Sequence, residues 1–337
     1  MLKCHTGIFG SVIKLKPLFL LTIIALFISQ GCSFNTKVLL FRKAFDSAGE
    51  TINDELQKHI PEGVTSIRNV NYIPSDTNAF MDIYYPESTN TAWNERPAIL
   101  WIHGGGWIAG SKNQIASYST ILAHRGYTVV AANYSLAPES QYPIPVIQLN
   151  NALAFLTKHS SKYKFNSKRI VIAGDSGGAQ IAAQLGIALT DSAYAKTLGI
   201  VPSVPRSTIS GMILFCGIYN FNNAVFGKEG VLLRMMLRAY SGSAFYKKKS
   251  DFILASVASY IPNNYPPTFI STGNNDVLKR HSYKLADTLK VKGVPVDELF
   301  FKNNRKVSLG HEYQFNLDDE SGKLALERTV RFLKSLD

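Results

Sequence analysis

The sequence predicts an α/β fold in which helices flank a mostly parallel sheet of eight strands. Short apolar runs alternate with longer stretches of helical periodicity across most of the 337 residues. This alternation is typical of repeated strand–helix–strand units, whose strands pair in parallel. Hydrophobic residues form 46% of the chain, and no internal repeat or low-complexity tract interrupts the series. We therefore expect one large domain with one sheet.

The predicted elements follow one another in a regular order. An amphipathic helix comes first, at residues 37–59, and is ended by Pro61 and Gly63. Strands are predicted at 64–72, 79–85, 97–102, 127–132, 169–173, 211–215, 268–271 and 296–301. Helices are predicted at 114–125, 145–164, 179–190, 282–292 and 324–336.

A serine framed by glycines lies where the strand 169–173 gives way to a helix. The run GDSGG at 174–178 has the form of a nucleophile elbow, a turn so tight that only small neighbours fit around the exposed hydroxyl of Ser176. A lone run of this kind is weak support, but HGGGW at 103–107 follows the strand 97–102. Glycine N–H groups there can bind a developing oxyanion. The expected donors are the N–H groups of Gly105, Gly106 and Gly177.

Chain order predicts the partners of Ser176. In elbow-type hydrolases an acid and then a histidine follow the serine. Asp276 lies in the loop after the seventh predicted strand, and His311 lies in the loop after the eighth. His281 comes only five residues after Asp276 and opens a helix, so it is the weaker choice. We predict His311 as the base and Asp276 as the carboxylate that orients it.

Several neighbouring residues are predicted to be structural. Asp175 adjoins the serine on a sharp turn, where consecutive side chains point apart. His103 is expected to brace the glycine-rich loop through a hydrogen bond, and Trp107 to be a packing or pocket residue. Cys216 lies in an apolar run and is predicted to be a small buried core residue. The His and Cys positions show no metal-ligand spacing, and no cofactor is predicted.

These motifs resemble the hormone-sensitive-lipase-like carboxylesterases of the α/β-hydrolase superfamily. HGGGW at 103–107 and GDSGG at 174–178 match motifs of that group, and YSLAPE at 134–139 resembles its YRLAPE. The resemblance covers roughly residues 64 to 336 and implies an α/β-hydrolase fold with a serine esterase site. Gly177 stands where the group usually has alanine, and Ser135 where it has arginine. His311 begins HEYQF rather than the HGF of that group.

The segment 219–267 is longer than a plain crossover between strands. In this superfamily, cap insertions occur at this place, so we expect it to cap the site. Leu233 and Met236 lie three residues apart on one face of its helical run, which would supply an acyl-binding wall. Core packing of that helix is the alternative. In the related esterases an N-terminal helix also contributes to the cap, which makes residues 37–59 a second candidate.

The N-terminus is typical of a targeting segment. Lys3, Lys14 and Lys16 precede an uncharged apolar run at 18–29, which is too short for a comfortable membrane span. Gly31-Cys32 then resembles the end of a bacterial lipoprotein signal, in which the cysteine is lipidated. The predicted division is a signal at 1–31, a linker and helix at 32–63, and the hydrolase domain at 64–337. Ser33 favours outer-membrane sorting, so we expect an envelope protein that faces the periplasm.

The chain carries a formal net charge of +12. Such a charge favours contact with an anionic membrane surface, although a basic enzyme without a charged partner is the plainer interpretation. Nucleic-acid binding is not expected, because the lysines are scattered and the cluster at 247–249 is short.

Together these features predict a serine carboxylesterase that acts on short or medium acyl esters through an acyl-enzyme intermediate. An arylformamidase-like amide hydrolase would use the same groups on a formamide. A lipid-anchored, non-catalytic binding scaffold is a hypothesis from a different class. The presence of serine, acid and histidine positions argues against it, because a scaffold needs none of them.

Overall fold

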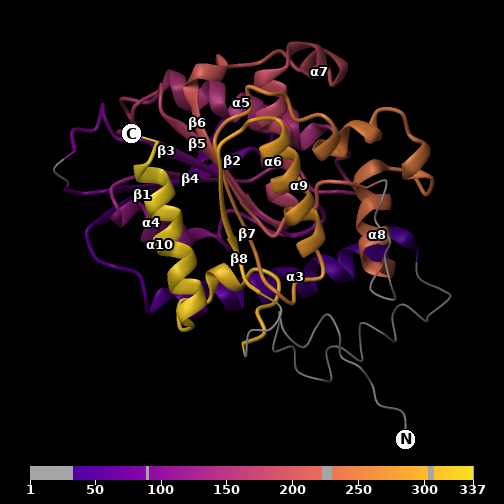
Figure 1. Ribbon diagram of the computed structural model, residues 1–337, viewed down its shortest axis with the longest axis horizontal. Coiled ribbons are helices and arrows are strands. Elements are labelled where there is room, and N and C mark those ends of the chain that lie inside the picture. Colours follow the sequence, from indigo (N-terminus) through magenta and orange to yellow (C-terminus); the bar gives the residue numbers. More distant parts are fainter. Residues whose placement is uncertain (1–32, 89–90, 222–229, 303–306, 337) are drawn as a thin grey trace, which may run out of the picture.

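The computed structural model describes residues 33–88, 91–221, 230–302 and 307–336 (Figure 1). Eight strands form one sheet in the order β1-β2-β4-β3-β5-β6-β7-β8. β1 and β2 pair in antiparallel fashion, as do β2 and β4, and all other neighbours are parallel. The predicted eight-stranded, mostly parallel sheet is confirmed. Its strands are β1 (Val64–Asn71), β2 (Phe80–Pro86), β3 (Ala98–Ile102), β4 (Thr128–Ala132), β5 (Ile170–Asp175), β6 (Ile209–Phe215), β7 (Thr268–Thr272) and β8 (Val296–Phe300).

The central strands are buried on both faces, which explains their continuous apolar sequences. Every residue of β3, β4 and β5 is buried. Alternate residues belong to two separate core clusters: Leu100 and Ile102 face one, whereas Ile99 and Trp101 face the other. Helices must therefore cover both sides of the sheet.

The helices form two layers. α5, α6 and α9 contribute to one core cluster, and α4 and α10 contribute to the other. Figure 1 shows α10 and α4 on one side of the sheet and α5, α6 and α9 on the other. The helices are α3 (Phe34–Gln57), α4 (Ala116–His124), α5 (Ile144–Lys158), α6 (Ser176–Thr190), α7 (Ser192–Thr197), α8 (Gly230–Ser241), α9 (Lys279–Val291) and α10 (Glu320–Lys334).

Several helix boundaries differ from the prediction, and two of them have a clear local reason. α3 begins at Phe34 rather than at residue 37, because the hydroxyl of Ser33 caps it by accepting from the Thr36 N–H at 3.2 Å. α5 ends at Lys158 rather than at residue 164. The chain there turns back toward β5, and Phe165 is buried in the core.

The segment 219–267, where it is described, alternates short helices with irregular chain. It contains α8 and three short 3₁₀ turns: η2 (Tyr246–Lys248), η3 (Phe252–Ala255) and η4 (Val257–Ser259). The predicted signal at 1–31 and Cys32 lie outside the described residues. In the part of the chain that the structure describes, no helix is both long and apolar enough to cross a membrane.

Candidate active site

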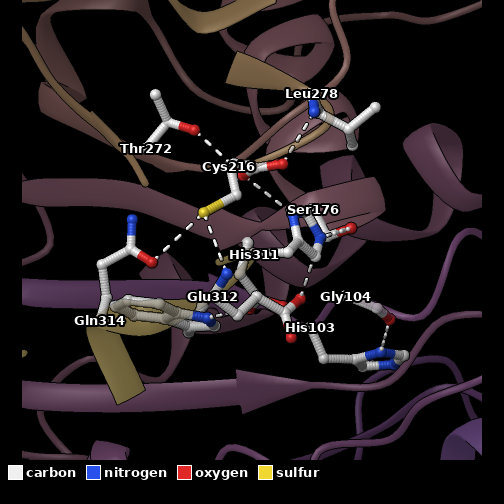
Figure 2. A network of polar contacts seen from close by, with 12 residues as sticks. His103, Gly104, Ser176, Cys216, Thr272, Leu278, His311, Glu312 and Gln314 are labelled. Atoms are coloured by element: carbon white, nitrogen blue, oxygen red, sulfur yellow. Dashed lines mark hydrogen bonds and ion pairs between the residues drawn. The ribbon is translucent and has the colours of Figure 1, made fainter. Parts of the chain in front are cut away.

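Three polar side chains from separate parts of the chain meet at the C-terminal edge of the sheet. Ser176 directly follows β5, Asp276 follows β7 and His311 follows β8. Nε2 of His311 lies 2.9 Å from Oγ of Ser176 (Figure 2). Nδ1 of the same ring lies 3.0 Å from Oδ2 of Asp276. The structure thus brings together the three side chains that chain order predicted.

The backbone at Ser176 has the strained geometry of an elbow. Its φ is 50°, a left-handed value that is uncommon for a residue with a side chain. α6 begins at this residue, so the predicted start at 179 is wrong. The elbow turns the chain from strand to helix without an intervening loop, which places the serine in the first helical turn.

The loop after β7 holds Asp276. The residue is 2% exposed, and its carboxylate accepts from the Leu278 N–H at 2.7 Å and from the Thr272 hydroxyl at 3.0 Å. Burial by itself would raise the pKa of Asp276. His311 and these donors outweigh burial and hold that pKa below its usual value. The residue is therefore a carboxylate aimed at Nδ1 of His311.

The two candidate histidines lie in different surroundings. Burial lowers the pKa of His311, but the carboxylates of Asp276 and Glu312 outweigh it, and the pKa is raised well above its ordinary value. His281 lines a separate cavity with Lys284, and burial lowers the pKa of His281 to about 4. His311, rather than His281, is the histidine at the serine.

The glycine-rich loop after β3 closely approaches the elbow. Gly105 and Gly106 have φ values of 102° and 57°, which glycine adopts at little cost. A Cβ at Gly177 would lie 3.1 Å from both the Cα and the backbone nitrogen of Gly106. A side chain at position 177 would therefore require the neighbouring loop to move by a few tenths of an ångström. The three predicted oxyanion donors therefore lie on two backbone segments that meet next to Ser176.

The motif at 134–139 fastens the glycine-rich loop. The hydroxyl of Tyr134 donates to the His103 carbonyl at 3.0 Å, and the two rings stack at 4.4 Å. The Ala137 N–H donates to the Trp107 carbonyl at 2.9 Å. Nδ1 of His103 lies 2.8 Å from the Gly104 carbonyl, so the predicted bracing hydrogen bond is confirmed. Burial lowers the pKa of His103 to about 4, which keeps this ring neutral.

Trp107 and Asp175 make structural contacts, as predicted, but Asp175 also lines the cavity beside Ser176 instead of pointing away from it. Trp107 is buried, stacks on Tyr240 at 4.9 Å and donates its indole N–H to Gln180 at 3.1 Å. Asp175 is buried and accepts from the indole of Trp101 at 2.8 Å. These contacts connect the elbow and the glycine-rich loop to the core.

Cys216 is buried, as predicted, but it also lies beside His311, which sequence reasoning missed. It directly follows β6, and its Sγ accepts from the Glu312 N–H at 3.3 Å and lies 3.2 Å from Oε1 of Gln314 (Figure 2). Gln314 in turn donates to the Ser271 hydroxyl at 3.2 Å. This network holds the histidine loop. One feature of the sequence could have indicated this role. Cys216 follows a parallel strand, and site residues gather at that edge of a sheet.

Glu312 is the second residue that was missed. It has a left-handed φ of 58°, and its Oε1 lies 3.7 Å from Nε2 of His311. Its side chain lines the cavity beside Ser176. Its position in the sequence, directly after the predicted base His311, could have indicated that it belongs to the site.

A cavity of about 90 Å³ opens beside Ser176. The glycine-rich loop, His311 and Glu312 form part of its wall, and α3 forms another part through Phe45, Ala48, Gly49 and Ile52. Arg42 fixes α3 in this place, because its guanidinium donates to the Ile108 and Ala137 carbonyls at 2.6 and 2.7 Å and pairs with Glu139 at 2.6 Å. The N-terminal helix, the second lid candidate, therefore borders the serine.

α8 contacts the glycine-rich loop instead of this cavity. A Cβ at Gly106 would lie 2.6 Å from Sδ of Met236, so the thioether packs against that glycine. Leu233 is partly buried and packs against the core. Among the described residues of 219–267, none lines the cavity beside Ser176.

The ligand atoms of Cys216, Asp276 and His311 lie within 4.8 Å of one another, close enough to surround a metal ion. Both nitrogens of His311 already have partners in Ser176 and Asp276. Burial raises the pKa of the Cys216 thiol to about 11, which disfavours the thiolate that a metal needs. The arrangement suits proton exchange between Nε2 of His311 and Ser176 better than metal binding.

Comparison with known proteins places these features in context. The BD-FAE family model matches residues 81–289. An esterase from Gibberella moniliformis is 28% identical over 267 residues, which are 75% of this chain and 77% of that protein. An acetyl esterase from Salmonella paratyphi B is 24% identical over 260 residues, which are 74% of each protein.

A solved structure shows the same fold. Esterase B from Lactobacillus rhamnosis, crystallised with a tributyrin phosphonate inhibitor, has a TM-score of 0.73 and 18% identity. The match covers 95% of this chain and 96% of that one. The fold is the α/β-hydrolase fold that the sequence motifs implied.

Proposed function

Because this chain belongs to the BD-FAE family, we propose that it is a serine carboxylic-ester hydrolase that cleaves short or medium acyl esters through an acyl-enzyme intermediate. The observation that carries the proposal is the continuous series of contacts from Ser176 through His311 to Asp276, at 2.9 and 3.0 Å. The relatives from Gibberella moniliformis and Salmonella paratyphi B are named as esterases, which supports this proposal.

In the first step, Ser176 Oγ attacks the ester carbonyl while Nε2 of His311 takes its proton. Asp276 holds Nδ1–H of the ring toward itself and stabilises the imidazolium that forms. The carbonyl oxygen becomes an oxyanion, and the N–H groups of Gly105, Gly106 and Gly177 would donate to it. Losing one such donor typically costs about 2.7–4 kcal/mol of transition-state stabilisation.

The imidazolium of His311 then gives its proton to the leaving alcohol as the tetrahedral intermediate collapses. The acyl group remains on Ser176. Water next gives up a proton to the same nitrogen and attacks the acyl-enzyme, which releases the acid and restores the serine. A single histidine serves both halves of the reaction because its two nitrogens face the serine and the carboxylate.

The size and lining of the cavity support the short end of the acyl range. The space beside Ser176 is about 90 Å³, and α3 lines it with Phe45, Ala48 and Ile52. Apolar walls favour an acyl chain over a charged group. The substrate is thus a small ester, with its acyl chain directed toward α3.

A substrate screen with the purified protein tests this function. We expect turnover of p-nitrophenyl esters to be highest between acetate and octanoate and to fall toward palmitate, with Ser176→Ala as the inactive control. N-formylkynurenine is included in the same screen. Faster turnover of that amide would replace the esterase by an arylformamidase-like hydrolase. Failure of every substrate in a folded protein would favour the non-catalytic scaffold.

We also propose that the enzyme is lipidated at Cys32 and held at the periplasmic side of the outer membrane. The support is the uncharged apolar run at 18–29, which follows basic residues and ends at Gly31-Cys32. Several acyl chains anchor a protein stably, whereas one binds only marginally. Labelled palmitate should enter the wild-type chain and not Cys32→Ser. Absence of label from the wild type would overturn this assignment.

A further inference from the structure

We propose that the outer surface of α8 and the turn after it form a docking face for an anionic lipid bilayer. This docking face is defined by four cationic and two apolar side chains: Arg234, Arg238, Lys247, Lys248, Val231 and Phe245. The proposal is independent of ester hydrolysis and does not require lipid at Cys32.

The docking face is rich in positive charge. Residues 230–250 contain five basic residues and no acidic one. Arg234, Arg238, Lys247 and Lys248 are exposed. Among the described residues, no carboxylate forms an ion pair with any of these four, and Lys249 is paired with Asp251 at 3.5 Å. Unpaired basic side chains of this kind are attracted by the negative surface of a membrane.

Apolar side chains are interspersed with these charges. Phe245 is 72% exposed and Val231 is 54% exposed. Basic residues beside exposed aromatic and aliphatic ones are typical of surfaces that lie in the headgroup region of a bilayer. The apolar residues favour a lipid surface over a purely ionic partner, because they gain from insertion among the acyl chains.

The packing of α8 leaves this face outward. Val231, Arg234 and Arg238 are three and four residues apart, so they share one side of the helix. The other side is buried, where Leu237 is in the core and Tyr240 stacks on Trp107. Met236 packs against Gly106. The helix therefore joins the docking face to the glycine-rich loop of the candidate active site.

The docking face lies next to the start of the described chain. The guanidinium of Arg238 is 4.2 Å from the centre of the Phe34 ring, and Figure 1 shows the first turns of α3 beside α8. Phe34 follows Cys32 by two residues, which span at most about 7 Å. A lipid anchor at Cys32 would therefore hold this face against the same membrane. Leu39, Leu40 and Lys43 are exposed on the neighbouring part of α3.

Vesicle binding tests the docking face directly. Residues 33–337, which carry the whole sheet and both helix layers, are sedimented with phosphatidylcholine vesicles that contain or lack phosphatidylglycerol. This start removes the apolar run of the leader, which would itself bind lipid. We expect binding to the anionic vesicles only, and loss of that binding at high ionic strength.

Charge variants localise the binding. Each basic residue at an anionic surface strengthens binding by about fivefold. Neutralising Arg234, Arg238 and Lys248 to glutamine should thus weaken it on the order of 100-fold. The matched control changes Lys162, Lys168 and Lys196 to glutamine. These exposed residues belong to or adjoin α5, β5 and α7, across the molecule from α3 (Figure 1). Phe245→Ser should weaken the binding that remains at moderate ionic strength.

The outcomes separate the alternatives. Equal weakening by the two triple variants would show attraction by net charge alone and overturn the docking face. Absence of binding at low ionic strength, or equal binding to neutral vesicles, would also overturn it. Thermal unfolding of each variant shows whether a loss of binding reflects a loss of fold. Because no readout uses an ester, failure here leaves the proposed hydrolase function untouched.

Discussion

Oε1 of Glu312 lies 3.7 Å from Nε2 of His311, the same nitrogen that contacts the hydroxyl of Ser176. A carboxylate at this distance favours the charged imidazolium over the neutral ring. It contributes, after Asp276, to raising the pKa of His311. Only the neutral ring can accept the serine proton, so Glu312 influences the pH range in which the site works.

Glu312→Gln should therefore extend activity to lower pH. Rate falls as pH drops through the pKa of His311, because protonation removes the base. Without the neighbouring carboxylate that pKa is lower, and the acidic limb of kcat/KM moves to lower pH. The measurement is a pH–rate profile for p-nitrophenyl acetate, with the exposed Glu320→Gln as the matched control. An acidic limb that stays at the same pH, or moves to higher pH, would contradict the proposed influence of Glu312 on His311.

Ser176→Ala should abolish ester turnover and leave the fold intact. The hydroxyl is the nucleophile, and the elbow needs only a small side chain at this place. Fluorophosphonate labelling followed by peptide mass mapping should identify Ser176 in the wild type and no serine in the variant. Label on another serine of an active preparation would refute the assignment.

His311→Ala and Asp276→Asn should both be severe, because serine, histidine and carboxylate act as a unit. The expected losses in kcat are on the order of a million-fold for His311→Ala and ten-thousand-fold for Asp276→Asn. His281→Ala is the control, since that ring lines a different cavity. Loss of activity in His281→Ala with retention in His311→Ala would reverse the choice of base.

Ile52→Ala should shift the acyl preference toward longer chains. Ile52 lines the cavity beside Ser176 from α3, so its truncation makes room for added methylenes. One methylene in an apolar pocket changes selectivity by roughly tenfold or more. The ratio of kcat/KM for octanoate and butyrate esters measures the change. Ile60→Ala, outside this cavity, serves as the control, and equal profiles for the two variants would exclude α3 as the acyl wall.

The double variant Leu233→Ala and Met236→Ala tests the cap expected from the sequence. If α8 sets the acyl preference, the same octanoate-to-butyrate ratio should change while a small organophosphate still labels Ser176 at the wild-type rate. Met236 packs against Gly106, so slower labelling would instead indicate that α8 supports the oxyanion loop. An unchanged ratio together with slower labelling would assign the acyl wall to α3 alone.

Local pattern was sufficient for most of the fold. The apolar runs of β3, β4 and β5 are buried on both faces and need no long-range information to be recognised as strands. Helix boundaries were predicted less accurately where one residue belongs both to a turn and to a helix. Ser176 ends the turn and also begins α6, and the helical periodicity becomes visible only after the glycines.

For the site, motifs and chain order identified Ser176, Asp276 and His311, because a serine in an elbow requires its acid and base in the loops after later strands. Nothing in the local sequence shows that Cys216 and Glu312 lie beside the same imidazole, or that α3 lines the cavity. Those contacts arise from the order of parallel strands, which brings the ends of β5, β6, β7 and β8 to one edge. They also arise from Arg42, which fixes α3 over that edge. Secondary structure and motif depend on near neighbours along the chain, whereas the composition of the cavity depends on how distant segments pack.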